Sequence, residues 1–151
     1  MSEDVFAAIR AEFPPGCVSI ETPWHGSAFV GGLCAVKRPA LAIEIGACRG
    51  HTSAYIAQSL KDLGHGEFVA YEYEPSWCEE SKGRLEVIWP GGNWNVVEGD
   101  FFKNYDGRPV DFCFLDIDPK TNYELAFRTV NFAPGAILVA HDLFHPPDFA
   151  V

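Results

Sequence analysis

Several polar segments each follow a short apolar run, and their residue types suit the binding of a polar ligand. The first segment reads Glu44-Ile-Gly46-Ala-Cys-Arg-Gly50-His51-Thr52. Glycines let the backbone turn tightly and approach a ligand, and a helix start presents N–H groups. The pattern Glu-x-Gly-x-x-x-Gly differs from the dinucleotide pattern Gly-x-Gly-x-x-Gly. Its wider spacing suits a ligand without a pyrophosphate; an ordinary tight turn is the alternative.

The next segments carry acidic residues at strand ends. Glu44 lies near the end of a predicted buried strand, where a carboxylate is costly unless it is paired; a ligand ammonium or sulfonium would supply the opposite charge. Glu72 ends the second run about 20 residues beyond the glycine loop, which is residues 46–50. An acidic residue at that position can accept both hydroxyls of a ribose. Asp100 ends the third and can accept from an adenine amino group, with Phe101 against the ring. A helix N-cap is the alternative for Asp100.

Together these three segments resemble class I S-adenosylmethionine-dependent methyltransferases, over residues 17–151. The resemblance implies S-adenosylmethionine as the cofactor. It places Glu44, Gly46 and Gly50 at the methionine end, Glu72 at the ribose, and Asp100 and Phe101 at the adenine. The remaining predicted cofactor contacts are Thr52, Tyr73, Gly99 and Asp116.

Two later segments narrow the resemblance. Asp116-Ile-Asp-Pro-Lys120-Thr-Asn-Tyr123 is similar to the Asp-x-Asp-Lys-x-Asn-Tyr motif of caffeoyl-CoA-type O-methyltransferases, with one extra residue before the lysine. His141-Asp142 stands where catechol-type O-methyltransferases carry Asp-Asn. The resemblance implies methylation of an oxygen on a small hydroxylated, catechol-like substrate. It also implies a divalent cation, Mg²⁺ or Mn²⁺, held by Asp116, His141 and Asp142.

The departures from those motifs leave the chemistry open. Imidazole favours Mn²⁺ and other transition metals over Mg²⁺. Without a metal, His141 is a candidate general base, because imidazole titrates near neutral pH. Lys120 either orients or deprotonates the substrate hydroxyl or is simply solvated, since Pro119 shifts its register. The predicted catalytic residues are therefore Asp116, His141 and Lys120.

The elements that must position these residues predict an α/β fold. Strands are expected at 41–45, 67–73, 94–98, 110–115 and 136–140, and helices at 3–12, 27–37, 51–63, 75–89 and 122–132. Residues 17–26 are expected to be irregular. This alternation predicts a Rossmann-like, doubly wound sheet of five mainly parallel strands, with ligands at the strands' carboxyl ends. Residues 1–151 then form a single S-adenosylmethionine-binding domain, with a helical cover over 1–40 and the core over 41–151.

Composition limits the partners. The chain has 151 residues and a formal net charge of −10, from 11 basic and 21 acidic residues. An acidic surface repels nucleic acid and anionic membranes, so a small molecule is the expected partner. The start of the chain lacks a secretory pattern, and the five cysteines show no paired motif. We expect reduced thiols and a cytoplasmic location.

The chain ends soon after the fifth expected strand, which makes it C-terminally short for the family. Residues 136–140 are then expected near a sheet edge, and an exposed edge favours covering by a second copy in a homodimer. A natural minimal form or a piece of a longer chain would also account for the short C-terminus. The functional alternatives are a cofactor-binding module or truncated methyltransferase-like protein without turnover, and a hydroxylase-like or lyase activity on the same scaffold.

Overall fold

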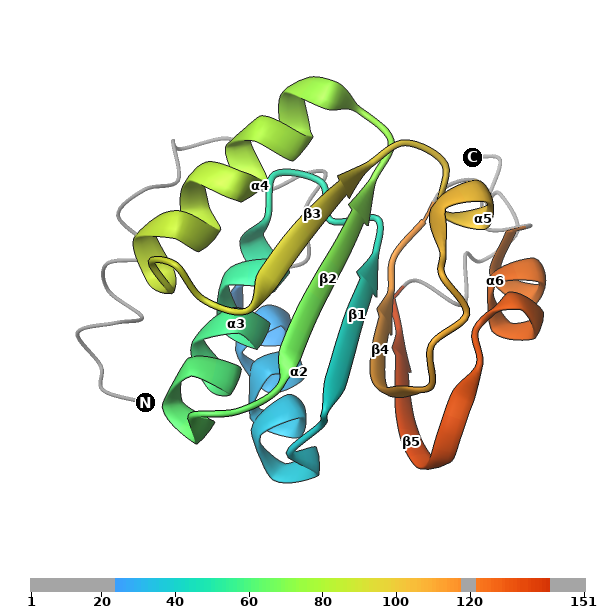
Figure 1. The fold of residues 1–151 in the computed structure, drawn as a ribbon, viewed down its shortest axis with the longest axis horizontal. Coiled ribbons are helices and arrows are strands. Elements are labelled where there is room, and N and C mark those ends of the chain that lie inside the picture. Colours follow the sequence, from blue (N-terminus) through green and yellow to red (C-terminus); the bar gives the residue numbers. More distant parts are fainter. Residues whose placement is uncertain (1–23, 118–121, 142–151) are drawn as a thin grey trace, which may run out of the picture.

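The computed structural model describes residues 24–117 and 122–141. Its centre is a sheet of five strands in the order β3-β2-β1-β4-β5, and all four strand pairings are parallel (Figure 1). The strands are β1 (Leu41–Ile45), β2 (Glu67–Glu72), β3 (Trp94–Glu98), β4 (Val110–Leu115) and β5 (Phe132–Ala140). The order reverses between β1 and β4, which confirms the predicted Rossmann-like arrangement.

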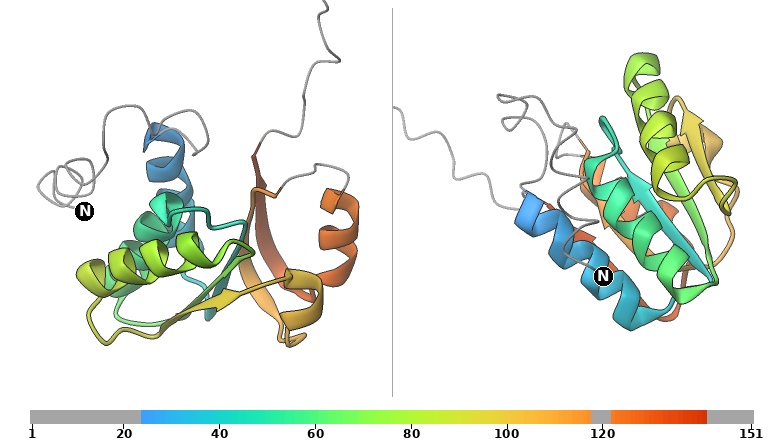
Figure 2. Two further views of the ribbon diagram at one scale, coloured as in Figure 1. Left: turned by 90° about the horizontal axis from the view of Figure 1, so that it is seen from above. Right: turned by 90° about the vertical axis from the view of Figure 1, so that its left-hand side faces the viewer.

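Helices cover both faces of the sheet (Figure 2). The helices on one face are α2 (Trp24–Lys37), α3 (His51–Leu63) and α4 (Pro75–Ile88), and those on the other are α5 (Phe101–Asn104) and α6 (Tyr123–Thr129). Val30 of α2, Leu60 of α3 and Leu85 of α4 share a core with Ala42 of β1. Ile43 of β1 instead belongs to the core beneath α5 and α6. The central strand is therefore buried on both sides, as its mainly apolar sequence predicts.

Most predicted boundaries agree with the structure: β1, α3, β3 and β4 begin and end where they were expected. The prediction that residues 24–26 are irregular is wrong, because α2 begins at Trp24. The hydroxyl of Ser27 lies 2.9 Å from that of Thr52 in α3. Such packing between helices overrides the low helix propensity of the glycines in α2.

The fifth strand begins four residues earlier than predicted. Pro134 and Gly135, which precede the predicted strand 136–140, lie inside β5. Proline is tolerated in an edge strand, and β5 is at the edge of the described sheet. The pairing with β4 is irregular, since Val110 pairs with Phe132 whereas Phe112 pairs with Ile137. The extra residues of β5 are accommodated there as a bulge.

Two helices also depart from expectation. Helix α6 ends at Thr129, and Phe132 already belongs to β5, so the predicted helix over 122–132 was too long. Helix α5 is four residues long and was not predicted, because so short a segment has no detectable periodicity. The expected helix over 3–12 lies outside the described residues.

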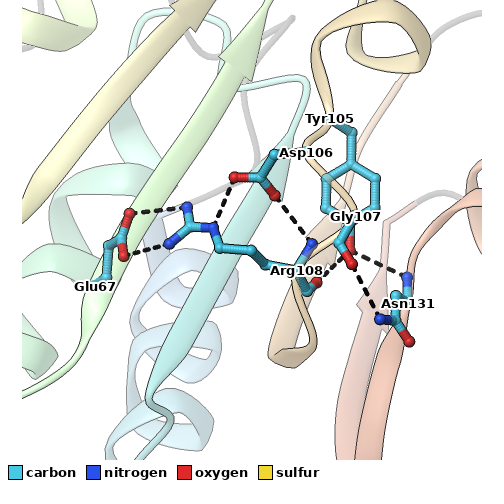
Figure 3. A network of polar contacts seen from close by, with 6 residues as sticks. All are labelled: Glu67, Tyr105, Asp106, Gly107, Arg108 and Asn131. Atoms are coloured by element: carbon cyan, nitrogen blue, oxygen red, sulfur yellow. Dashed lines mark hydrogen bonds and ion pairs between the residues drawn. The ribbon is translucent and has the colours of Figure 1, made fainter.

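A polar network lies at the amino edge of the sheet, away from the carboxyl ends (Figure 3). Arg108 donates from its two terminal nitrogens to both carboxylate oxygens of Glu67, at 2.6 and 2.9 Å. Its Nε donates to Asp106 at 2.7 Å, and Asn131 donates to the Gly107 carbonyl at 3.0 Å. This network connects the starts of β2, β4 and β5.

Two further expectations concern the surroundings of the domain. Residues 136–140 lie at the edge of the sheet that the described residues form, as predicted; covering of that edge by a second copy stays a prediction. No helix in the described part of the chain is long and apolar enough to cross a membrane.

Candidate functional site

Hydrogen bonds join the carboxyl ends of neighbouring strands into one rim. Each bond runs from a backbone N–H just past one strand to a carbonyl at the end of the next strand in the sheet. The donors and acceptors are Gly46 to Tyr71 (2.9 Å), Gly99 to Glu72 (2.8 Å), Asp116 to Ile45 (2.9 Å) and His141 to Leu115 (3.0 Å). The structure thus brings the predicted segments to a single edge of the sheet.

Gly46 is required by the close contact between two of these segments. Its φ is +88°, and a Cβ added there would lie 2.0 Å from the carbonyl oxygen of Asp116. Every other residue type would therefore collide with the backbone after β4 and would also adopt an unfavourable left-handed conformation. The glycine loop and the segment that begins at Asp116 are packed backbone against backbone.

The carboxylate of Glu72 binds the backbone on both of its sides. Oε2 accepts from the N–H of Cys48 in the glycine loop at 2.6 Å, and Oε1 accepts from the N–H of Glu74 at 2.8 Å. The side chain is 6% exposed. A carboxylate has about four lone-pair sites, so both oxygens keep accepting capacity for ligand hydroxyls. This geometry is compatible with the predicted ribose contact.

Glu44 is 1% exposed, which confirms that its carboxylate is buried. It accepts a hydrogen bond from the hydroxyl of Ser53 in α3, a partner that no sequence motif indicated. The charge of Glu44 also adds to burial in raising the pKa of the Cys113 thiol. The hydroxyl lowers the cost of the buried carboxylate, and the contact of Glu44 with a ligand cation stays a prediction.

Asp100 is observed as a helix N-cap, the alternative left open by its sequence. Its Oδ1 accepts from the backbone N–H of Phe102 at 3.0 Å. Phe101 is 5% exposed, and its ring packs against Tyr71 and Tyr105 with centroids 5.0 and 5.2 Å apart. The adenine contacts of Asp100 and Phe101 stay predictions.

The other predicted cofactor residues differ in exposure. Tyr73 is 77% exposed directly after β2. Thr52 is 4% exposed, and its hydroxyl contacts the hydroxyl of Ser27 in α2. Gly50 and Gly99 both have positive φ, +81° and +110°, as tight turns after β1 and β3 require. Thr52 therefore faces a neighbouring helix, and Tyr73 has a surface available for a ligand.

Asp116 and His141 come together although 25 positions separate them in the sequence. Oδ2 of Asp116 lies 3.3 Å from Nδ1 of His141, and the two side chains are 21% and 29% exposed. The hydroxyl of Tyr123, for which the sequence predicted no role, donates to the carbonyl of His141 at 2.5 Å. Parallel pairing of β4 with β5 places the pair at adjacent strand ends. Lys120 and Asp142 lie outside the described residues.

The donor set around Asp116 meets part of what a metal requires. Two ligands bound side by side at about 2.1 Å from one ion lie about 3 Å apart, so the 3.3 Å separation of Asp116 and His141 fits a shared cation. It fits a direct contact between the two side chains equally well. In residues 24–117 and 122–141, no group of three or more His, Cys, Asp or Glu side chains is placed to hold a metal.

The buried cysteines do not offer a nucleophile. Cys34, Cys78 and Cys113 are buried free thiols. Burial raises the pKa of Cys34 to about 12 and, with the nearby charge of Glu72 as a second cause, that of Cys78 to about 11. These buried thiols stay protonated near neutral pH, and reactivity requires the thiolate.

A doubly wound sheet with a Glu-x-Gly-x-x-x-Gly loop after β1 and an acidic residue at the end of β2 fits the class I methyltransferase fold. The methyltransferase-domain family matches residues 43–143, more than half of the chain. The chain belongs to this family. A comparison with curated protein sequences gives no significant match.

Solved structures show the same fold at low sequence identity. The O-methyltransferase TomG from Streptomyces achromogenes, in complex with SAM, is 20% identical with a TM-score of 0.74; the match covers 93% of this chain and 66% of TomG. An O-methyltransferase from Bacillus cereus in complex with SAH is 18% identical with a TM-score of 0.70, covering 93% and 66%. SAH-bound PaMTH1 from Podospora anserina is 18% identical with a TM-score of 0.74, covering 92% and 60%. The chain thus spans about two thirds of the length of TomG.

Proposed function

We propose that this chain transfers the methyl group of S-adenosylmethionine to an oxygen of a small hydroxylated molecule such as a catechol. The observation that carries the proposal is the Asp116–His141 pair, 3.3 Å apart where β4 and β5 end. The same rim carries Glu72 and the glycine loop. Groups that could bind a nucleoside and groups that could accept a proton therefore lie at the same edge of the sheet. TomG and the Bacillus cereus protein, which share the fold, are O-methyltransferases.

The cofactor site in this proposal is built around Glu72. Its carboxylate accepts the two ribose hydroxyls with the lone pairs that Cys48 and Glu74 leave available. The glycine loop lies beside the methionine end, and Tyr73 and Asp100 lie on the adenine side. Bound there, S-adenosylmethionine supplies a methyl group activated by an adjacent sulfonium.

The reaction also needs a group that accepts a proton. The oxygen–carbon bond forms as the carbon–sulfur bond breaks; the electron pair stays on sulfur, and the hydroxyl proton must leave. Nδ1 of His141 faces Asp116, which favours a proton on Nδ1 and leaves Nε2 to accept the hydroxyl proton. The carboxylate of Asp116 then orients the ring and stabilises the imidazolium. Holding the two reactants in line contributes the larger part of the lowering of the activation barrier, about 7–11 kcal/mol in favourable cases.

A divalent cation is a finer part of the proposal. Asp116 and His141 would hold it, with Asp142 as the predicted third ligand, and it would lower the pKa of a coordinated substrate hydroxyl. Loss of turnover with a chelator, restored by Mn²⁺ or Mg²⁺, would support the cation. Turnover that is unchanged by the chelator would support His141 acting as the base without a metal.

The test measures transfer of a labelled methyl group to a panel of catechols and related phenols. His141→Asn should lower turnover by about 10²- to 10⁴-fold, the usual contribution of a general base, while the affinity for S-adenosylhomocysteine stays within about twofold. His65→Asn is the matched control, because His65 is exposed near the opposite edge of the sheet. Full turnover in His141→Asn would show that the pair has no role in the reaction.

Cofactor binding without turnover is the less favoured alternative. A module that only holds the cofactor has no need of a carboxylate and an imidazole at adjacent strand ends. The same assay separates the two functions: binding of S-adenosylhomocysteine without any methyl transfer to the panel would favour the binding module.

A further inference from the structure

Three side chains on one face of α4 donate to backbone carbonyls at the rim. Cys78, Ser81 and Arg84 recur every three residues, which places them along one side of the helix; we call them the α4 donor row. Their donor atoms and acceptors are Sγ of Cys78 to the Glu72 carbonyl (3.3 Å), Oγ of Ser81 to the Cys48 carbonyl (3.0 Å) and Nε of Arg84 to the Arg49 carbonyl (2.7 Å).

The acceptors are the last residue of β2 and two residues of the glycine loop, so one helix binds two parts of the predicted cofactor site. Cys78 and Ser81 are fully buried, and buried polar groups in proteins are hydrogen-bonded as a rule. Burial and the charge of Glu72 raise the pKa of Cys78 to about 11. Its thiol therefore keeps the hydrogen that it donates at neutral pH.

The donor row completes the attachment of the glycine loop. The N–H groups of Gly46 and Ala47 both bind the Tyr71 carbonyl, at 2.9 and 3.2 Å, and the N–H of Cys48 binds Glu72 at 2.6 Å. Cys48 has a φ of +50°, a strained conformation for a residue other than glycine, and it persists only where neighbouring contacts hold it. The bonds from α4 supply such contacts on the carbonyl side of the loop.

Gly50 brings the loop into direct contact with α4. A Cβ added at Gly50 would lie 2.8 Å from Oγ and 2.9 Å from Cα of Ser81. No layer of other side chains separates the end of the loop from the helix. A change at Ser81 is therefore transmitted directly to the backbone of the loop.

We propose that the α4 donor row positions the glycine loop for the cofactor, so that Ser81 and Arg84 determine cofactor affinity by acting through the loop. A loop that is already held in its binding conformation loses less entropy when the ligand binds. This inference rests on the proposed binding of S-adenosylmethionine, and it assigns to α4 a role in addition to core packing.

The experiment compares two buried serines. Ser81→Ala removes a bond to the glycine loop, whereas Ser59→Ala removes a bond to the Gly31 carbonyl of α2 (2.8 Å), further along α3 from the loop. Both variants should lose a similar amount of stability in denaturant unfolding. Affinity for S-adenosylhomocysteine, measured by calorimetry where both are folded, should fall about fivefold to tenfold in Ser81→Ala and less than about twofold in Ser59→Ala, in keeping with the net value of one hydrogen bond.

A second pair of variants tests the other end of the row. Arg84→Lys keeps a charged donor and should retain affinity within about threefold, whereas Arg84→Leu should lose about fivefold to tenfold. Arg84 is only partly buried, so this pair also serves if Ser81→Ala does not fold. Equal affinity in the lysine and leucine variants would overturn the role of Arg84.

Hydrogen exchange supplies a readout that needs no ligand. The amides of residues 46–50 should exchange several times faster in Ser81→Ala than in the wild type and should be unchanged in Ser59→Ala. Unchanged exchange in Ser81→Ala, or unchanged affinity, overturns the donor row as a positioning device. A wild-type protein that does not bind S-adenosylhomocysteine would instead refute the proposed function, and the exchange measurement would still decide whether α4 holds the loop.

Discussion

The substitution Glu72→Gln tests the ribose contact, because it keeps the size of the side chain and removes its charge. The carboxylate accepts from Cys48 at 2.6 Å and from Glu74 at 2.8 Å. An amide has one oxygen, so its NH₂ group must face one of these two N–H donors. A hydrogen bond to a charged group contributes about 1.5–3 kcal/mol. We expect unfolding free energy to fall by about 2 kcal/mol, near the lower end of that range, because Glu74 is exposed and its N–H can bind water.

The effect on the cofactor is separate from the effect on stability. Both ribose hydroxyls lose a charged acceptor, so we expect affinity for S-adenosylhomocysteine to fall at least about tenfold, or about 1.4 kcal/mol. Calorimetry at a temperature where the variant is folded measures it. Glu98→Gln is the matched control, because Glu98 pairs with Glu72 in register and is exposed. Equal affinity in Glu72→Gln and the wild type would show that Glu72 does not bind the ribose.

The remaining predictions concern strain and surface charge. Cys48→Gly should leave the unfolding free energy in urea within about 1 kcal/mol of the wild type. Cys48→Val should lose about 1–3 kcal/mol, because a β-branched residue tolerates a φ of +50° poorly. Equal losses in the two variants would show that the backbone at Cys48 is not strained. Arg108→Ala should lower stability by about 1 kcal/mol or less in thermal unfolding, since the ion pairs that it makes with Glu67 and Asp106 are partly exposed. The pKa of Asp106 is lowered first by the backbone N–H of Arg108 and then by its side chain. The stabilisation from this carboxylate is therefore present above its unfolded pKa and is lost as pH falls through the lower folded pKa, which an acid titration of the unfolding free energy measures.

Part of the site could be read from the sequence because its signals are local. The strands β1, β3 and β4 are mainly apolar segments bounded by turn residues, and Gly46 and Gly50 stand in the loop that follows the first of them. Parallel strands place all their carboxyl ends at one edge. Glu72 ends β2, so its position at that edge followed from the same rule. The burial of Glu44 followed from its place inside β1.

Other parts of the site depend on contacts that leave no pattern in the sequence. The hydrogen bonds from Ser81 and Arg84 reach 33 and 35 positions back along the chain, and neither residue belongs to a motif. Ser53 beside Glu44 could have been suspected only from the need of a buried carboxylate for a partner.

What the sequence by itself determined is the class of fold, the edge of the sheet where the polar segments meet and the residue types gathered there, because hydrophobic periodicity and turn residues act over a few positions. Only the tertiary structure decided that Asp116 meets His141 at 3.3 Å, that α4 donates hydrogen bonds to the glycine loop, and that β5 includes Pro134. Each of these depends on strand order, register and helix packing, which arise when distant segments bury a shared core.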